Sequence, residues 1–307
     1  MNIGFGIDGG GTRSRLVLFE PGSLRVLHRE EGGPTNPHSA GMAGAQDNLR
    51  QLLLAGCQAL KITLADLACG CLGSAGLGRP LEQAVFLDFL QGLTKAPLHV
   101  CSDGEILLVG STGSLSGYCL IAGTGSFALG RNQAGQVVRA GGLGHMLGDE
   151  GSASWIGWQA MRRALASLEH RDMETRMMPA LLAHYGLSAP EDSIPLFHQH
   201  FDKAQVAASS PLVLAAAAEN DPLALDILAQ AARALFQLIK SVVRQQPQEA
   251  LHIALAGGLL ERDNLLQKAL LQQIAEAYPA ARTAVAQPQD AMKGACMLAD
   301  ALVNQTG

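Results

Sequence analysis

The sequence contains the same arrangement of strands and glycines twice. Near the start, FGIDGGGTRSRLVLF (5–19) places three glycines between two short apolar runs, and a further turn and apolar run follow over 21–29. The order restarts at 118, where apolar runs flank GTGS and a third run covers 137–140. Short apolar runs bounded by turn residues are typical of strands in a meander. The repeat predicts an internal duplication, with a coincidence between two unrelated meanders as the alternative.

Each meander is followed by alternating helical and strand patterns. In the first half, helical periodicity covers 42–60 and 80–92, and short apolar strands cover 67–72 and 97–101. In the second half, we expect helices over 150–166, 172–186, 204–219, 222–244, 263–278 and 289–304, with a strand over 251–256. This pattern predicts the α/β class, with helices packed on the sheets. A chain of 307 residues suits two domains of about 150 residues, with a boundary near 112–118.

Composition argues against several classes of partner. Hydrophobic residues make up 48% of the chain and charged residues 16%, with a net charge of −5 and no cluster of Lys and Arg. These values argue against nucleic acid or an anionic membrane as the main partner. No apolar run reaches the roughly 18 residues of a membrane span, and the N-terminus does not resemble a secretory signal. The six cysteines lack paired CxxC spacing, so we expect reduced, structural thiols in a cytoplasmic protein.

The extra glycines of the two turns predict a binding role. A hairpin needs one glycine, whereas several let an anion approach backbone N–H groups with no side chain in the way. Asp8, at the strand end, is suited to hold the water shell of Mg²⁺, and Thr12 can donate its hydroxyl to a phosphate. The turn Gly123–Ser126 offers the same kinds of group. A tight hairpin without a ligand is the alternative for each turn.

Neither turn fits the other common phosphate-binding motifs. The chain lacks the GxxxxGK[ST] sequence, and neither glycine turn leads directly into a helix, as a dinucleotide-binding GxGxxG does. Two threonine-bearing turns at equivalent points of a duplicated fold instead suggest a pair of hairpins that holds a polyphosphate.

Other candidate residues stand at strand ends or in loops. Asp103 ends a strand in CSDG and Asp149 precedes an expected helix; each is a candidate to orient a hydroxyl or take its proton, with a helix N-cap as the alternative. Gly257-Gly258 either leaves room for a nucleoside or makes a plain turn. Asn36 suits a ligand hydroxyl and an Asx turn equally. We interpret His145 as a structural histidine.

Together these residues resemble the sugar kinases of the actin/hexokinase/Hsp70 superfamily, and within it the N-acetylglucosamine kinases of the BadF/BadG/BcrA/BcrD ATPase family. The similarity extends over nearly the whole chain and is carried by GIDGGGTRS, PTN, CSDG, IAGTGS, GGLGHMLGDEGSASWI, NDPLA and ALAGGL. It implies two ribonuclease-H-like domains, 1–115 and 116–288, around a central cleft for ATP and Mg²⁺. It also implies a helical insertion in the second domain, a C-terminal helix (289–307) that packs back on the first, and a homodimer.

The resemblance also assigns site residues by motif position. It implies Asp8 for the metal and Asp103 as the catalytic base. The positions implied for ATP are Gly9, Gly10, Gly11, Thr12, Gly123, Thr124, Gly125, Gly257 and Gly258. Those implied for a hexosamine are Asn36, Asp103, Ser126, Gly142, Gly144 and Asp149. Phe127 and Leu143 flank the sugar and depart from the asparagine and tryptophan of related kinases, which bears on N-acetyl recognition.

The similarity implies phosphorylation of the 6-hydroxyl of N-acetylglucosamine with ATP. Phosphorylation of glucosamine is an alternative within the family, and an ATPase that activates a partner enzyme is another. The cysteine motif that ligates the iron–sulfur cluster of such activators is missing, as is the two-cysteine zinc motif of the ROK sugar kinases. A non-catalytic sugar sensor is a further alternative, weakened by the presence of both phosphate turns and a candidate base.

Overall fold

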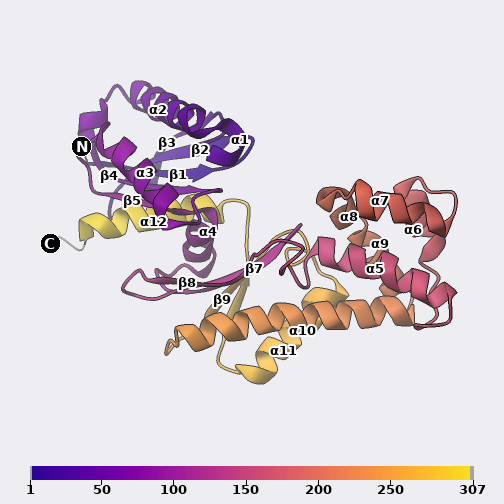
Figure 1. Ribbon diagram of the computed structural model, residues 1–307. Coiled ribbons are helices and arrows are strands. Elements are labelled where there is room, and N and C mark those ends of the chain that lie inside the picture. Colours follow the sequence, from indigo (N-terminus) through magenta and orange to yellow (C-terminus); the bar gives the residue numbers. More distant parts are fainter. Residues whose placement is uncertain (1, 305–307) are drawn as a thin grey trace. The chain divides into compact units, whose positions relative to one another are not determined.

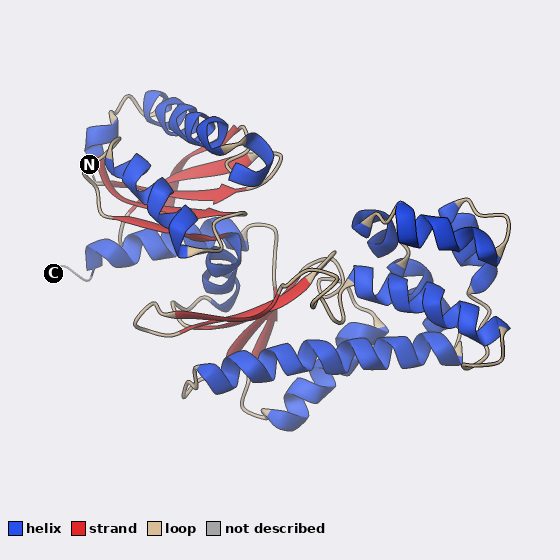
Figure 2. Cartoon of the chain, viewed as in Figure 1, coloured by secondary structure: helices blue, strands red, loops and turns tan. Residues whose placement is uncertain are grey.

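The computed structural model describes residues 2–304 and divides the chain into two compact units (Figure 1). The first unit contains the chain up to Gly117, the short segment Arg131–Gln136 and the C-terminal part from Ala286. The second contains Tyr118–Gly130 and Val137–Val285. Each is built on a five-stranded sheet with helices against it, so the α/β prediction is confirmed (Figure 2).

The sheet of the first unit has the strand order β3-β2-β1-β4-β5. Its strands are β1 (Ile3–Gly9), β2 (Ser14–Glu20), β3 (Arg25–Gly32), β4 (Leu67–Ser74) and β5 (Leu98–Ser102). The first three form the expected antiparallel meander, β4 runs parallel to β1, and β5 runs parallel to β4. The carboxyl ends of β1, β4 and β5 therefore lie at the same edge of the sheet.

Helices cover both faces of this sheet. They are α1 (Pro37–Ala40), α2 (Met42–Ala59), α3 (Pro80–Gln91), α4 (Asp103–Thr112) and α12 (Asp290–Asn304), with a 3₁₀ turn at Leu64–Asp66. The apolar sides of α2 and α3 pack with Phe5 and its alternate neighbours on β1 in one core cluster. On the opposite face, α12 packs on β1 and β4 and crosses α4 closely where Gly110 and Gly294 meet.

The sheet of the second unit repeats this strand order. From one edge it is β8-β7-β6-β9-β10, which is again three consecutive strands followed by two later ones. Its strands are β6 (Gly117–Ala122), β7 (Ser126–Arg131), β8 (Val137–Gly141), β9 (His252–Ala256) and β10 (Arg282–Val285). β9 runs parallel to β6, and β10 runs parallel to β9. The duplication predicted from the glycine turns is therefore confirmed in the topology.

The second unit is mostly helical between β8 and β9. Its helices are α5 (Ala153–Leu168), α6 (Met178–Tyr185), α7 (Ser193–Gln199), α8 (Lys203–Ala208), α9 (Ser210–Ala218), α10 (Pro222–Gln245) and α11 (Leu265–Ala277), with a 3₁₀ turn at Pro190–Asp192. By length and composition α10 could cross a membrane, but it is amphipathic. Ile227, Ala231 and Leu235 lie on its apolar side and are buried in the core of this unit.

The structure differs from the expected elements in a few places. The single helix expected over 204–219 is divided into α8 and α9, because Pro211 lacks an N–H and starts a new helix instead of continuing the first. The helix expected over 172–186 begins only at Met178, again next to a proline. The sequence pattern assigned no helix over α4 beyond the N-cap alternative for Asp103, because this helix is buried around most of its circumference and so lacks amphipathic periodicity. The short α7 and β10 were also missed.

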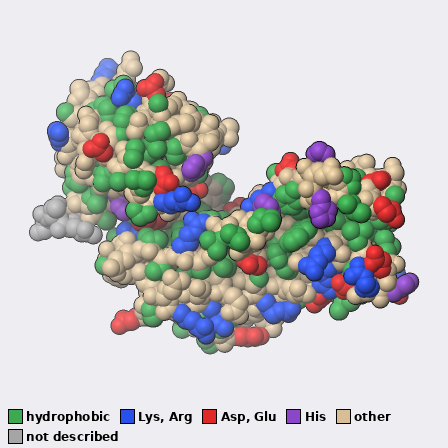
Figure 3. All heavy atoms as spheres, in the orientation of Figure 1, with side chains coloured by type: hydrophobic (Ala, Val, Ile, Leu, Met, Phe, Trp, Pro, Cys, Tyr) green, Lys and Arg blue, Asp and Glu red, His purple; other side chains and the backbone are tan. Residues whose placement is uncertain are grey.

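The positions of the cysteines and of the charged side chains bear on two expectations from composition. All six cysteines are buried, as expected of thiols that pack as small hydrophobic residues. Charged side chains of both signs are mixed over the face drawn in Figure 3, and Lys and Arg occur there singly or in small groups. The face that is drawn therefore shows no extended basic field.

Candidate functional site

The register of the first sheet gathers several predicted residues at one edge. Gly9 at the end of β1 is paired with Ser74 on β4, and Ser74 is paired with Ser102 on β5. Since neighbouring strands lie about 4.8 Å apart, β1 and β5 end roughly 10 Å from one another. The first glycine turn follows β1 at this edge, and Asp103 follows β5. The sheet thus brings a predicted phosphate turn and the candidate base to the same edge of one unit.

A buried network of hydroxyl groups supports the first glycine turn. The Oγ atom of Ser14 lies 2.9 Å from Oγ1 of Thr35, which lies 3.1 Å from Oγ of Ser74. Ser74 also donates to the Gly9 carbonyl at 3.2 Å. A Cβ on Gly9 would overlap the Thr35 hydroxyl, so this packing requires glycine. One of the extra glycines is therefore explained by the approach of neighbouring strands.

The following part of the turn is exposed and lies beside Asn36. Gly11 and Thr12 are exposed, and a Cβ on Gly11 would lie 3.7 Å from Nδ2 of Asn36. Oδ1 of Asn36 accepts a hydrogen bond from the His38 N–H at 2.9 Å and so caps α1. This is the Asx-type hydrogen bond that was one of the two alternatives for Asn36. It leaves the Nδ2 donor on the side of the glycine turn, where a ligand hydroxyl or phosphate can accept from it.

Asp8 forms an ion pair across the hairpin. Its Oδ2 lies 2.5 Å from Nη2 of Arg15, the residue opposite it on β2. Because this carboxylate oxygen is engaged, Asp8 is suited to hold water molecules of a hydrated Mg²⁺ and less suited to coordinate the ion through both oxygens. The residues at this edge therefore fit a largely hydrated ion that phosphates help to bind.

Asp103 is exposed in the first turn of α4. The N-cap is Ser102, whose hydroxyl accepts a hydrogen bond from the Glu105 N–H at 3.2 Å, so the N-cap alternative for Asp103 is wrong. Oδ1 of Asp103 accepts a hydrogen bond from the Gly104 N–H at 2.9 Å. A carboxylate in this position is oriented by the helix start and stabilised by the helix dipole. Its place at the sheet edge allows contact with a hydroxyl group of a ligand.

Glu105 anchors the start of the helix that carries Asp103. Its buried Oε1 lies 2.8 Å from Nε of Arg131 and 3.0 Å from Nε2 of His99. Burial acts to raise the pKa of Glu105, but the hydrogen bonds and charges of His99 and Arg131 outweigh it and lower the pKa. Burial acts to lower the pKa of His99, but hydrogen bonds to Cys101 and Glu105 raise that pKa to about 10. The result is a charged triad inside the first unit.

This triad predicts a pH dependence of stability. The pKa of His99 is raised from 6.5 to about 10, so its protonated form stabilises the fold fully below pH 6.5 and the contribution is lost as the pH rises towards 10. The pKa of Glu105 is lowered from 4.5, so its contribution is present above pH 4.5 and lost as the pH falls through the folded value. Thermal unfolding should show a larger loss of Tm between pH 6.5 and 10 in the wild type than in His99→Gln. Equal losses in the two proteins would contradict this assignment.

The second glycine turn is built around a buried aspartate. The turn joins β6 to β7, and Asp149, which is 3% exposed, packs against it. Oδ1 of Asp149 accepts a hydrogen bond from the Ser126 N–H at 3.3 Å and would lie 2.9 Å from a Cβ on Gly125. Asp149 has a φ of 60°, a left-handed conformation that is uncommon outside glycine. The N-cap of α5 is Ser152, so the N-cap alternative is wrong for Asp149 as well.

The segment after Asp149 is tied back to the same turn. The Ser126 hydroxyl donates to the Glu150 carbonyl at 2.8 Å, and the Ala153 N–H donates to the Gly123 carbonyl at 2.8 Å. The GDEGSASW segment and the AGTGS turn are therefore one connected structure, although they lie apart in the sequence. This connection holds the backbone N–H groups of the turn in place before any ligand binds.

Lys203, at the start of α8, forms an ion pair with Asp149. Its Nζ lies 2.7 Å from Oδ2, and the Asp149 side chain is almost fully buried. We expect Lys203→Met to lower the free energy of unfolding by about 1–3 kcal/mol, because a buried carboxylate would lose its charged partner. Lys268→Met is the matched control, since its pair with Asp263 is exposed and should contribute less than about 1 kcal/mol. Urea unfolding measures both; equal effects would contradict the prediction.

The loop after β8 carries the remaining residues predicted for the sugar. Gly142 and Gly144 have φ values of 70° and 84°, and Leu143 between them is 67% exposed. The Gly142 N–H donates to the Ser126 carbonyl at 2.9 Å, which joins this loop to the second glycine turn. Phe127 is partly buried next to it, and the centre of the Arg139 guanidinium lies 4.3 Å from its ring centroid. Within the second unit, the predicted sugar residues thus lie along one connected segment.

A cavity of about 590 Å³ opens beside the second glycine turn. It is lined by Gly123 and Thr124, by Gly258 with the residues after β9, and by small side chains of α8 and α9. A Cβ on Gly123 or Gly258 would meet no neighbouring atom, so the space next to the backbone of these two residues is open. Gly257 differs: it has a φ of 90°, and a Cβ would overlap the Ala122 carbonyl. The cavity has the size of a small-molecule site and collects three of the residues predicted for the nucleotide.

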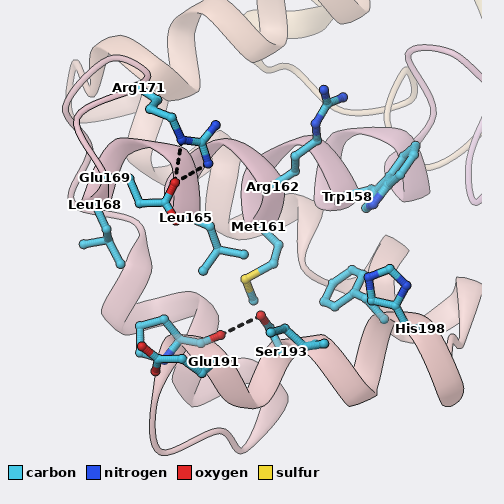
Figure 4. Close-up of a pocket in the computed structure, with 13 residues that line it drawn as sticks. Trp158, Met161, Arg162, Leu165, Leu168, Glu169, Arg171, Glu191, Ser193 and His198 are labelled. Atoms are coloured by element: carbon cyan, nitrogen blue, oxygen red, sulfur yellow. Dashed lines mark hydrogen bonds and ion pairs between the residues drawn. The ribbon is translucent and has the colours of Figure 1, made fainter.

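A different cavity in this unit contains none of the predicted residues. It has a volume of about 480 Å³ and lies between α5 and the segment around α7 (Figure 4). Met161 and Leu165 face it, and Trp158 and His198 lie at one end. Its lining offers apolar contacts and mixed charges but no glycine turn, so the phosphate chemistry predicted from the sequence does not lie there.

Some residues that matter at these sites were not predicted from the sequence. Glu105 belongs to a helix that was not expected, although an acid two residues after a candidate base was a visible signal. Lys203 lies far from both glycine turns in the sequence, and the residues around it did not indicate a role at either turn. Arg139 lies on an expected strand, where an exposed charge is ordinary. His145, which we interpreted as a structural histidine, is exposed, and its ring stacks on Phe201 with centroids 4.6 Å apart.

Comparisons with known proteins agree with this fold. The model of the BadF/BadG/BcrA/BcrD ATPase family matches residues 5–299. A protein from Clostridium acetobutylicum named N-acetylmuramic acid/N-acetylglucosamine kinase is 30% identical over 303 residues, covering 97% of this chain and 98% of the relative. An N-acetyl-D-glucosamine kinase from Dictyostelium discoideum is 29% identical, covering 90% and 91%. The crystal structure of a protein from Chromobacterium violaceum, provisionally named an N-acetylglucosamine kinase, has a TM-score of 0.68 at 26% identity, covering 97% and 99%.

Proposed function

The chain belongs to the BadF/BadG/BcrA/BcrD ATPase family, and from this membership and its glycine turns we propose that it transfers the γ-phosphoryl group of ATP to the 6-hydroxyl of N-acetylglucosamine. Relatives that align over nearly the whole chain carry this sugar in their names. Their identity of about 30% supports the reaction class more strongly than it supports one sugar.

One observation carries the proposal: an exposed carboxylate and a glycine turn lie at the same edge of the first sheet. Phosphoryl transfer to an alcohol needs little more than positioning, a base near the attacking hydroxyl, and donors around the phosphates. We assign the base to Asp103, which would take the 6-hydroxyl proton as the oxygen attacks phosphorus. The glycine turns Gly9–Thr12 and Gly123–Gly125 would let the phosphates approach the backbone and would supply donors for the charge that develops on them. The N–H groups of Gly10 and Gly123 instead donate to the Arg13 and Gly125 carbonyls and hold the turns in shape.

The remaining roles follow the motif positions that the resemblance implies. We assign Asn36, Ser126, Gly142, Gly144 and Asp149 to the sugar, with Phe127 and Leu143 beside it. We assign Gly257-Gly258 and the cavity next to them to the adenosine part of ATP. Asp8 would hold the water shell of Mg²⁺, which when bound neutralises phosphate charge.

ATP consumption measured across several sugars tests the proposal. We expect consumption to depend on an added hexosamine and to be highest with N-acetylglucosamine, with smaller rates for glucose, glucosamine and N-acetylmannosamine. The product should be identified by NMR as the 6-phosphate. A preference for glucosamine would favour glucosamine kinase activity within the same family, in line with Phe127 and Leu143 replacing the residues of related kinases.

A partner-activating ATPase and a non-catalytic sugar sensor would each give a different result in the same assay. The ATPase would consume ATP at the same rate with and without sugar. The sensor would bind sugar in calorimetry but consume no ATP. The homodimer and the domain limits implied by the resemblance stay predictions, as does the cytoplasmic location expected from the cysteines, and light scattering tests the homodimer.

A further inference from the structure

A histidine, a cysteine and a glutamate meet at the junction of β5 and α4 in the first unit. One ligand atom from each of His99, Cys101 and Glu105 lies within 4.8 Å of the other two. Cys101 is 1% exposed and Glu105 5%, whereas His99 is partly exposed and gives access from the surface. Imidazole, thiolate and carboxylate groups are the protein ligands of Zn²⁺, which usually takes four ligands in a tetrahedron. These three groups therefore supply most of the coordination sphere of a zinc ion.

The sheet register brings Cys71 to the same place, because Cys71 on β4 is paired with His99 on β5. Gly73, further along β4, is paired with Cys101. Paired residues share a face of the sheet, as do alternate residues of one strand, so all of these positions lie on one face. The helix α4 packs on this face, since a Cβ on Gly73 would overlap Ile106. The thiol of Cys71 is fully buried and interacts with that of Cys101, so it can serve as a fourth ligand.

The charges around this cluster are compatible with a divalent ion. Nε of Arg131 donates to Oε1 of Glu105 at 2.8 Å, and both side chains are buried. With Zn²⁺ bound, two thiolates and the Glu105 carboxylate carry three negative charges, which Zn²⁺ and Arg131 together neutralise. A group that holds a metal ligand by a hydrogen bond from outside the coordination sphere is a regular part of zinc sites. Arg131 is thus placed to support the carboxylate ligand.

We propose a zinc site in the first unit with four ligands: Cys71, His99, Cys101 and Glu105. Two thiolates and an imidazole select Zn²⁺ over Mg²⁺, which binds oxygen ligands and water, so this site is separate from the one assigned to Asp8. On binding, Zn²⁺ takes the place of the protons of the imidazole and both thiols, which pass to solvent. Because α4 begins between two of the ligands in the chain, the ion would fix the first turn of this helix.

A hydrogen-bonded network without a metal is the other explanation for this cluster. The contacts of His99 and Arg131 with Glu105 satisfy that carboxylate by themselves. In that explanation the two thiols only fill space as small hydrophobic groups, whereas a zinc site uses both as ligands. The two explanations differ in whether the reduced protein binds a thiophilic metal ion at this cluster.

Titration of the metal-free, reduced protein with Co²⁺ and then Zn²⁺ tests the site. Bound Co²⁺ should show thiolate-to-metal charge-transfer absorption and the d–d bands of a tetrahedral ion, and Zn²⁺ should abolish both because it binds such a site more tightly. Zn²⁺ should also raise Tm, since it binds the folded state. Cys101→Ala and His99→Gln should each lower the metal affinity about 10-fold or more, because even the loss of a group that only supports a ligand costs about 10- to 100-fold.

The matched controls change the same residue types elsewhere in the first unit. Cys57→Ala removes a buried thiol from α2, and His28→Gln removes a histidine that is paired with Glu30. Both should keep the wild-type absorption and metal affinity. Cys71→Ala keeps three ligands and should reduce the thiolate absorption by about half, which provides a second test if Cys101→Ala does not fold.

The outcomes decide between the two explanations. Co²⁺ binding without thiolate absorption, or no binding at all, would overturn the inference. Absorption and affinity that are the same in wild type, Cys101→Ala and Cys71→Ala would also overturn it, because the ion would then be bound elsewhere. No measurement here involves sugar or ATP, so a failure of the zinc site leaves the proposed function as it stands, and a failure of that function leaves the site.

Discussion

Asp103→Asn should reduce the rate of sugar phosphorylation by about 10²- to 10⁴-fold, the usual contribution of a general base. The reason is local: an amide cannot take the proton of the attacking hydroxyl, while it keeps the shape of the carboxylate. The variant should fold, because Asp103 is exposed and Ser102 caps the helix. The loss of one charge from the first helical turn should cost only about 0.3–1 kcal/mol.

This prediction requires measurements that separate chemistry from folding and binding. Single-turnover rates give the chemical step, calorimetry gives ATP affinity, and thermal unfolding gives stability. Asp47→Asn, which removes an exposed carboxylate from α2 in the same unit, serves as the matched control and should keep the wild-type rate. A rate for Asp103→Asn within about 3-fold of wild type would show that another group takes the proton.

The second large effect is expected where α4 and α12 cross in the first unit. A Cβ on Gly294 would overlap the Ile106 carbonyl, and a Cβ on Gly110 would overlap the Asp290 carbonyl. Both obstacles are backbone atoms, which cannot move without separating the helices. We therefore expect Gly294→Ala to lower the free energy of unfolding by about 3 kcal/mol or more, at the upper end of the cost of overpacking.

Gly44→Ala on α2 makes the same chemical change in a helix of the same unit and provides the control. A Cβ there would lie 3.8 Å from Ala40, an ordinary contact. Because alanine favours the helix over glycine, this variant should be as stable as wild type or about 0.5–1 kcal/mol more stable. Urea unfolding of the two variants gives the comparison. Similar stabilities would mean that the helices separate at little cost.

Much of the fold was visible in the sequence because the signals are local. Apolar runs around GGGT and GTGS predict strand–turn–strand units, and the structure contains both with the same strand order in each sheet. The helical period over 222–244 matches α10 (Pro222–Gln245). Prediction failed over α4, where burial on nearly all sides removes the amphipathic period, and over 204–219, where Pro211 divides the helix.

The residues of the candidate site likewise separate into those that the sequence identifies and those whose contacts only the structure reveals. Glycines, an aspartate at a strand end and an asparagine before a proline can be identified from residue type and spacing, and these features mark Asp8, Asn36, Asp103 and the two turns without any coordinates. The sequence by itself therefore determined the strands, the turns and the residue types at the sheet edges, because hydrogen bonding and backbone freedom act between near neighbours in the chain. Only the tertiary structure decided that Lys203 pairs with Asp149, that Arg131 reaches Glu105 and that Arg139 lies on Phe127. These side chains select their partners through the packing of segments that are distant in the chain, and burial then sets the strength of each charge interaction.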